Sequence, residues 1–116
     1  MPQTSLTTLD QFTFHRTLSA TRGVSLIFFS SRECGSCRLW RQRLLQYAQL
    51  DPALKLFEVD AERDLALTRE FEVWHLPALF LYRDGDFHCA LECAAHTAAL
   101  AQAIQTALAA PAQELP

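Results

Sequence analysis

Two cysteines, Cys34 and Cys37, lie three residues apart in the segment Cys34-Gly35-Ser36-Cys37. Side chains with this spacing share one face of a helical turn, so the two sulfur atoms can lie close together. Paired thiols exchange disulfide bonds with other thiols, and paired thiolates also contribute to zinc and iron–sulfur sites. The segment alone therefore supports redox chemistry and metal binding equally.

The neighbouring segments place Cys34 in an activating environment. The apolar run Val24–Phe29 precedes the cysteine pair, and Arg38–Leu45, which has helical character, follows it. This order puts Cys34 at a helix N-terminus, where backbone N–H groups are unpaired and the helix dipole is positive. Such a position favours the thiolate, which is the nucleophilic form of cysteine.

Two further cysteines, Cys89 and Cys93, provide the basis for an alternative metal site. Together with the first pair and with His88 and His96, they supply enough donors for zinc or an iron–sulfur cluster. However, the second pair lies on a predicted strand, and no metal-binding knuckle surrounds either pair. We therefore expect no bound metal.

The composition indicates one ordinary globular domain spanning residues 1–116. Half of the residues are hydrophobic and a fifth are charged, and the net charge of −3 does not indicate nucleic acid as a partner. The longest apolar stretches are too short to cross a membrane, and the N-terminus lacks the basic start of a secretory signal. We therefore expect a protein of the cytoplasm without a membrane partner, and we also expect a monomer. In a reducing compartment, cysteines are more often catalytic, redox-sensing or metal-binding than structural.

The elements that must position the cysteine pair alternate between strands and helices. This alternation predicts an α/β fold whose central mixed sheet of four to five strands has helices on both faces, and an Asp84-Gly85 hairpin adds an antiparallel edge. The expected elements are an extended piece near Ser5–Thr7, a helix capped by Thr8 and closed by Gly23, a central strand Val24–Phe29, a helix from Arg38 to Asp51-Pro52, a strand Leu54–Asp60, a helix Ala61–Phe71, a strand Ala78–Tyr82, a strand Phe87–Cys93 and a helix Thr97–Ala109.

Periodic apolar positions predict the buried face of each longer helix. These positions are Leu9, Phe12, Phe14 and Leu18 in the first helix, Leu39, Trp40, Leu44, Leu45 and Tyr47 in the second, and Leu100, Ala103, Ile104, Ala107 and Leu108 in the last.

Four features occur in an order that covers nearly the whole chain. They are the apolar strand leading to Cys34-Gly35-Ser36-Cys37, the strand end Val59-Asp60, the segment Leu76–Tyr82 with Pro77 as its second residue, and the Asp84-Gly85 turn before the last strand and helix. In these features the sequence resembles the thioredoxin family. The resemblance implies the thioredoxin fold, and the order of the features is more specific than the cysteine spacing.

The resemblance implies a thiol–disulfide oxidoreductase with a role in cell redox homeostasis. Cys34 would attack a protein disulfide, and Cys37 would resolve the mixed disulfide, so that a redox-active Cys34–Cys37 disulfide forms without any bound cofactor. Pro77 would follow a cis peptide bond, and the backbone of Leu76 would pair with the substrate. A reductase would restore the dithiol, with NADPH as the ultimate electron source.

The residues around Cys34 and Cys37 depart from the family pattern. Ser36 stands where the family commonly has Pro, and its N–H and hydroxyl can stabilise the Cys34 thiolate, whereas the carboxylate of Glu33 disfavours it. Phe28 stands where typical thioredoxins have a buried Asp that handles the proton of the second cysteine. Glu58 is the acidic candidate for that role, although we favour the alternative that it is an edge-exposed carboxylate. These departures predict a specialised rather than a general thioredoxin.

Two substrate-site residues have alternative interpretations. Cys93 falls where the family usually has Gly beside the substrate groove, and Cys89, four residues earlier on the predicted strand, would point to the same face. We favour two small half-buried residues over a resolving or regulatory thiol at Cys93. Trp74 and His75 would contribute to a docking surface if the protein were a thioredoxin-fold adaptor or a redox-sensing binding module. Alternatively, Trp74 caps the core.

Overall fold

The computed structural model describes residues 3–116. In chain order these residues form β1 (Thr7–Leu9), α1 (Phe14–Ala20), β2 (Val24–Ser30), α2 (Gly35–Leu50), β3 (Lys55–Asp60), α3 (Leu65–Glu70), β4 (Ala78–Arg83), β5 (Asp86–Leu91) and α4 (Thr97–Ala109). Within this part of the chain, no helix combines the length and the apolar character needed to cross a membrane.

β2 is the central strand of the sheet that these residues form. The described residues contribute five strands in the order β1-β3-β2-β4-β5. β3 pairs in parallel with both β1 and β2, whereas β4 is antiparallel to β2 and β5 is antiparallel to β4. The mixed sheet and the antiparallel edge predicted from the sequence are therefore confirmed.

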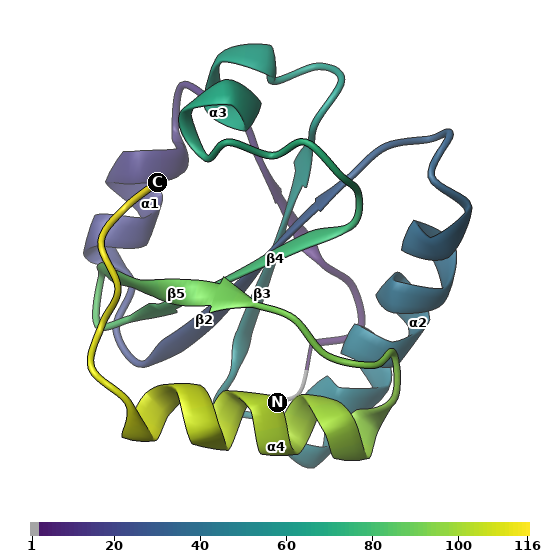
Figure 1. Ribbon diagram of the computed structural model, residues 1–116, viewed down its shortest axis with the longest axis vertical. Helices are drawn as coiled ribbons and strands as arrows, with labels where there is room; N and C mark the ends of the chain where they lie inside the picture. The colour runs from purple at the N-terminus through teal and green to yellow at the C-terminus, as the bar shows by residue number, and fades with distance from the viewer. Residues whose placement is uncertain (1–2) are drawn as a thin grey trace.

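Helices cover both faces of the sheet, because alternate side chains of β2 point in opposite directions. Leu26 and Phe28 pack with α2 and α4 in one core cluster, while Ile27 and Phe29 pack with α1 and α3 in the other. Figure 1 shows α1 and α3 together on one side of the sheet and α2 and α4 on the other. An apolar strand between two apolar layers is the arrangement that the run Val24–Phe29 predicts.

Several predicted elements are confirmed nearly to the residue. β2, β4 and α4 occupy the expected segments, and Leu100 and Ile104 form the buried stripe of α4. The hairpin between β4 and β5 turns at Asp84 and Gly85, both of which have positive φ angles, at 52° and 89°. The Asp-Gly pair is suited to this geometry because glycine adopts positive φ without steric cost.

The prediction of the first helix is wrong in its start and in part of its buried face. Thr8 lies in β1 rather than at a helix cap, and Phe12 is 83% exposed. The helix begins only at Phe14 because the Asp10 carboxylate accepts hydrogen bonds from the backbone N–H groups of Phe12 and Thr13, which fixes a turn. Gly23 does not close the helix, which ends at Ala20, but turns the chain into β2 with φ at 78°.

Three smaller predictions are also corrected. The helix expected over Ala61–Phe71 is shorter, because the Asp60 carboxylate binds the N–H groups of the residues that follow it and holds them in a turn. Leu39 is 41% exposed rather than buried, because it lies away from the face of α2 that meets the sheet. β5 ends at Leu91, so Cys93 lies beyond the strand on which it was predicted.

Candidate active site

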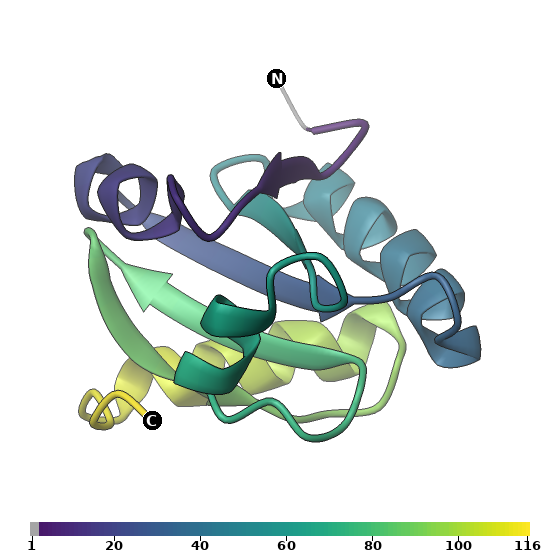
Figure 2. The same ribbon diagram turned by 90° about the horizontal axis from the view of Figure 1, so that it is seen from above.

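The Cys34–Cys37 pair lies in the connection between the central strand and α2. The chain passes from β2 through a loop into α2 (Figure 2). β2 ends at Ser30 and α2 begins at Gly35, so Cys34 is the N-cap residue of the helix. The two sulfur atoms are 2.12 Å apart and form a disulfide. The backbone N–H of Cys37 donates to Cys34 Sγ at 3.2 Å, and the Ser36 hydroxyl lies 3.7 Å from the same sulfur. Cys34 therefore occupies the helix N-terminus that the sequence predicts.

The two cysteines differ in their access to solvent. Cys37 is only 1% exposed and packs with Phe28 and Trp40 in the core cluster between the sheet and α2. Cys34 is half-buried and borders an open cavity. A substrate can therefore reach the sulfur of Cys34 more readily than that of Cys37, which is the asymmetry that an attacking and a resolving thiol require.

The peptide bond between Leu76 and Pro77 is cis, as the family resemblance implied. Pro77 lines two hollows, one of about 220 Å³ that it shares with Trp40 and Cys93, and one of about 340 Å³ that it shares with Trp74. Trp74 is 75% exposed, so the alternative that it caps the core is wrong. The structure thus brings together Pro77 and Cys93, two of the residues that the sequence assigned to substrate binding.

The sequence profile of the thioredoxin family matches residues 5–106. The chain belongs to the thioredoxin family. It is 28% identical over 82 residues to mitochondrial thioredoxin-3 of Saccharomyces cerevisiae, and this alignment spans 71% of the chain and 65% of the relative, slightly less than two thirds.

Solved structures have the same fold. The oxidised form of yeast mitochondrial thioredoxin 3 has a TM-score of 0.76 at 25% identity, covering 87% of this chain and 94% of that one. Thioredoxin of Trypanosoma brucei brucei has the same TM-score of 0.76 at 19% identity, with coverage of 92% and 94%. The thioredoxin fold expected from the sequence is thereby confirmed.

The other two cysteines of this thioredoxin-family chain are free thiols. Cys89 is buried, and Cys93 is half-buried against the same core cluster. Burial raises the pKa of both thiols because it disfavours the charged thiolate. Among residues 3–116, no group of three or more His, Cys, Asp or Glu side chains is arranged to hold a metal ion.

The structure corrects one of the two expectations for Glu58. Its strand, β3, lies between β1 and β2, and its side chain is 17% exposed, so the expectation of an edge-exposed carboxylate is wrong. It pairs in register with Phe28, forms an ion pair with Arg41 and accepts a hydrogen bond from the Ser30 hydroxyl at 2.5 Å. The Arg41 guanidinium also lies 5.6 Å from the ring centroid of Phe28. Glu58 is thus a half-buried carboxylate whose oxygens are engaged by Arg41 and Ser30.

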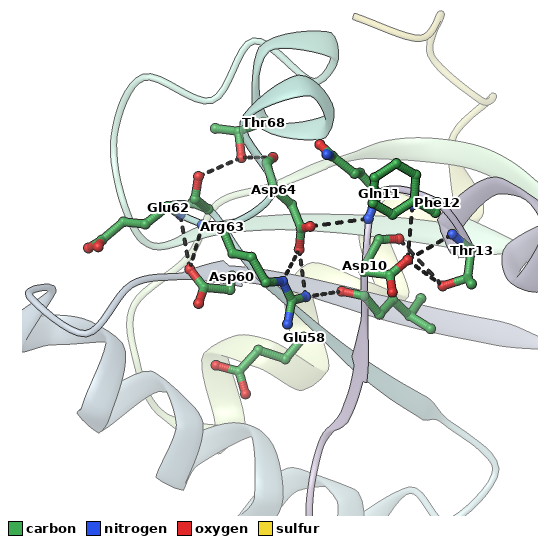
Figure 3. A network of polar contacts seen from close by, with 12 residues as sticks. Asp10, Gln11, Phe12, Thr13, Glu58, Asp60, Glu62, Arg63, Asp64 and Thr68 are labelled. Atoms are coloured by element: carbon green, nitrogen blue, oxygen red, sulfur yellow. Dashed lines mark hydrogen bonds and ion pairs between the residues drawn. The ribbon is translucent and has the colours of Figure 1, made fainter.

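Sequence reasoning missed a charged cavity of about 390 Å³ that opens beside Cys34. Its walls come from the ends of β1, β2 and β3 and from the first turns of α2, and they carry four arginines, Arg32, Arg38, Arg41 and Arg63. Figure 3 shows Arg63 and Asp60 above Glu58 at the end of β3. The parallel pairing of β1 and β2 with β3 is the signal that could have revealed it, because parallel strands bring their carboxyl ends to one edge of the sheet.

Proposed function

We propose that this protein is a thiol–disulfide oxidoreductase that reduces protein disulfides through Cys34 and Cys37. One observation carries the proposal: the Cys34–Cys37 disulfide at the N-terminus of α2 has one accessible and one buried sulfur, in a chain of the thioredoxin family. The cis Leu76–Pro77 bond supports it, because the family uses this loop to hold the substrate backbone.

The reaction proceeds through a mixed disulfide. In the reduced protein, the Cys34 thiolate attacks one sulfur of the substrate disulfide, and the other substrate sulfur leaves as a thiolate that takes up a proton. Cys37 then loses its proton and attacks Cys34 Sγ, which releases the second substrate thiol and forms the Cys34–Cys37 disulfide. Two electrons pass from the dithiol to the substrate. A reductase that draws on NADPH is the proposed partner that restores the dithiol.

The position of Cys34 supports this sequence of steps. At the N-cap of α2, the thiolate accepts the Cys37 N–H and meets the positive end of a helix that has no acidic residue in its first turn. No cofactor is required, because the two thiols exchange both electrons directly. We further propose that the protein acts as a monomer in the cytoplasm and contributes to cell redox homeostasis, which fractionation and size-exclusion chromatography would test.

Reduction of insulin disulfides in the presence of dithiothreitol tests the proposed activity. The wild-type protein should accelerate insulin precipitation, and Cys34→Ser should be no faster than dithiothreitol alone. Cys89→Ala is the matched control, because it removes a thiol of the core while leaving the disulfide pair intact. Equal rates for the wild type and Cys34→Ser would reject the oxidoreductase and favour a thioredoxin-fold adaptor. Covalent trapping with Cys37→Ser would identify the protein substrates by mass spectrometry.

A further inference from the structure

The cavity beside Cys34 is separate from the region that the family uses for the substrate backbone. It shares no lining residue with the hollow of about 220 Å³ beside Pro77 and Cys93. Its volume of about 390 Å³ falls within the range of small-molecule sites, roughly 300–1,000 Å³. A substrate chain held at Pro77 therefore leaves this second wall of the site free for another part of the substrate.

Two of the four arginines in the cavity already have partners. Arg41 forms an ion pair with Glu58, and Arg63 binds Asp64 and the carbonyl oxygen of Leu9. Arg32 and Arg38, by contrast, are exposed and form no ion pair within residues 3–116. The uncommitted positive charge of the cavity is thus carried by the two arginines on either side of Cys34 in the sequence.

The acidic residues of the cavity only partly balance this charge. Glu58 is neutralised by Arg41, and the Asp60 carboxylate accepts the backbone N–H groups of Glu62 and Arg63 at 3.0 and 3.1 Å. Glu33 is exposed and forms no ion pair within the described residues. The cavity lining therefore carries four arginines against three carboxylates, Glu33, Glu58 and Asp60, and the positive end of α2 adds to this excess next to the reactive sulfur.

We infer that this cavity binds a carboxylate of the disulfide substrate, held by Arg32 and Arg38. The inference rests on the proposed oxidoreductase function and names the class of substrate, a disulfide with an acidic group close to the cysteine that is attacked. Guanidinium groups bind carboxylates through paired hydrogen bonds, which lysine cannot match. Two arginines without ion pairs, offset by the Glu33 and Asp60 carboxylates, suit a singly charged carboxylate better than a doubly charged phosphate.

The chemical step remains the balanced exchange described above. The carboxylate neither gains nor loses electrons, and its binding places the substrate sulfur against Cys34. Since an extended residue spans about 3.3 Å, an acidic side chain within two residues of the attacked cysteine lies within reach of arginines at the same site. The carboxylate can belong to a protein side chain or to a small peptide disulfide, and the two sources have the same recognition chemistry.

Paired peptide substrates test the inference. Two peptide disulfides would differ only at the two positions on each side of the cysteine, which would be Glu in one peptide and Gln in the other. Oxidised glutathione would serve as the small peptide disulfide. The measured quantity is the ratio of kcat/KM for the Glu peptide to that for the Gln peptide. We expect each of Arg32→Gln and Arg38→Gln to lower this ratio about two- to fivefold, as is typical of exposed ion pairs.

Two further variants test whether the effect on the ratio depends on the sign of the charge and on its position in the cavity. Glu33→Gln should raise the ratio by about two- to threefold, since it removes an exposed carboxylate that repels the carboxylate of the substrate. Arg16→Gln removes the same charge from α1, on the other face of the sheet, and should leave the ratio unchanged. High salt should weaken the preference of the wild type, because exposed charges are screened.

The outcomes separate the inference from the function on which it rests. If the wild type reduces the Gln peptide but its ratio is one, the inference is overturned and the proposed function stands. The same holds if Arg16→Gln and Arg38→Gln change the ratio equally. Failure of the wild type to reduce either peptide overturns the proposed function, and the inference with it. Both remaining outcomes support the inference and identify the source of the carboxylate. If Arg32→Gln and Arg38→Gln lower kcat/KM more for oxidised glutathione than for the Glu peptide, the carboxylate belongs to small disulfides. If they lower kcat/KM more for the Glu peptide, it belongs to proteins.

Discussion

Replacement of Asp64 should destabilise the edge of the sheet that supports the charged cavity. The Asp64 side chain is 3% exposed and accepts hydrogen bonds from Arg63 Nε and Nη2 at 3.1 and 2.6 Å and from the backbone N–H of Gln11 at 3.3 Å (Figure 3). Arg63 Nη2 also donates to the carbonyl oxygen of Leu9 at 3.1 Å. These contacts join the end of β1 to the loop between β3 and α3.

The expected loss of unfolding free energy in Asp64→Ala depends on how exposed each partner of Asp64 is. The Arg63 side chain is 49% exposed, so solvent screening limits the ion pair to about 1 kcal/mol. The hydrogen bond to the Gln11 N–H is long, and a bond of this kind to a charged acceptor contributes about 1.5 kcal/mol at the lower end of its range. Asp64→Ala should therefore lower the free energy of unfolding by about 2–3 kcal/mol, which for a domain of this size is a fall in Tm of about 10 °C.

Urea denaturation, followed by circular dichroism, measures this change. Asp64→Asn keeps one oxygen for the Gln11 N–H and should cost about 1 kcal/mol. A double-mutant cycle with Arg63→Gln should give a coupling energy of about 1 kcal/mol. Asp86→Ala, which removes an exposed acid at the hairpin, is the matched control and should change stability by less than about 0.5 kcal/mol. A loss for Asp64→Ala no larger than that of the control, or zero coupling, would refute the reasoning.

Three further predictions concern the candidate active site and the turns and thiols of the fold around it. Glu58→Gln should cost about 1 kcal/mol of stability but change insulin reduction less than about threefold, since Glu58 is engaged by Arg41; a tenfold loss of rate at unchanged stability would instead assign it the proton. Gly85→Ala places a Cβ 2.6 Å from the carbonyl oxygen of Ser19 at positive φ and should cost more than about 2 kcal/mol, whereas Gly35→Ala, with nothing within 4 Å, should be nearly neutral in the same denaturation assay. The raised pKa of Cys93 lowers the fraction of its thiol that is ionised at pH 8. In the reduced protein, iodoacetamide should therefore alkylate Cys93 more slowly than it alkylates the same residue in an unfolded control, and the two rates should approach each other as the pH rises. Mass spectrometry measures both rates.

The sequence predicts best those elements whose local signals agree with their tertiary position. The run Val24–Phe29 is apolar at every position except Ser25, which is what a strand covered on both faces requires. The last helix combines alanine-rich propensity, a buried stripe and a terminating Pro111, and it begins and ends where predicted. In both segments, no competing local interaction redirects the chain.

The first helix fails because helical spacing and turn chemistry compete in the same residues. Leu9 and Phe12 have the right spacing for a helix with Phe14, yet Leu9 belongs to β1 and the Asp10 side chain holds the next residues in a turn. An aspartate that accepts N–H groups two and three residues later stabilises the non-helical conformation. Recognising Asp10 as the start of the turn would have moved the helix to its true beginning.

The candidate site was predictable only where its residues are close in sequence or carry a family signature. Cys34, Cys37 and Pro77 met those conditions. The charged cavity did not, since its walls come from three strand ends, and the partners of Glu58 lie 17 and 28 residues earlier, at Arg41 and Ser30. Such pairings depend on strand register, which a single sequence does not state.

The distribution of charge around the disulfide gives the prediction of a specialised member of the thioredoxin family a physical form. Within the described residues, Cys37 packs in a cluster of apolar side chains, and the family's acidic position holds Phe28, which is fully buried. The carboxylate of the adjacent strand, Glu58, is bound by Arg41 on the cavity side. The charges of the site therefore face the substrate at Cys34 and not the resolving thiol, so substitutions along this wall should alter which disulfides react more than they alter how readily the dithiol closes.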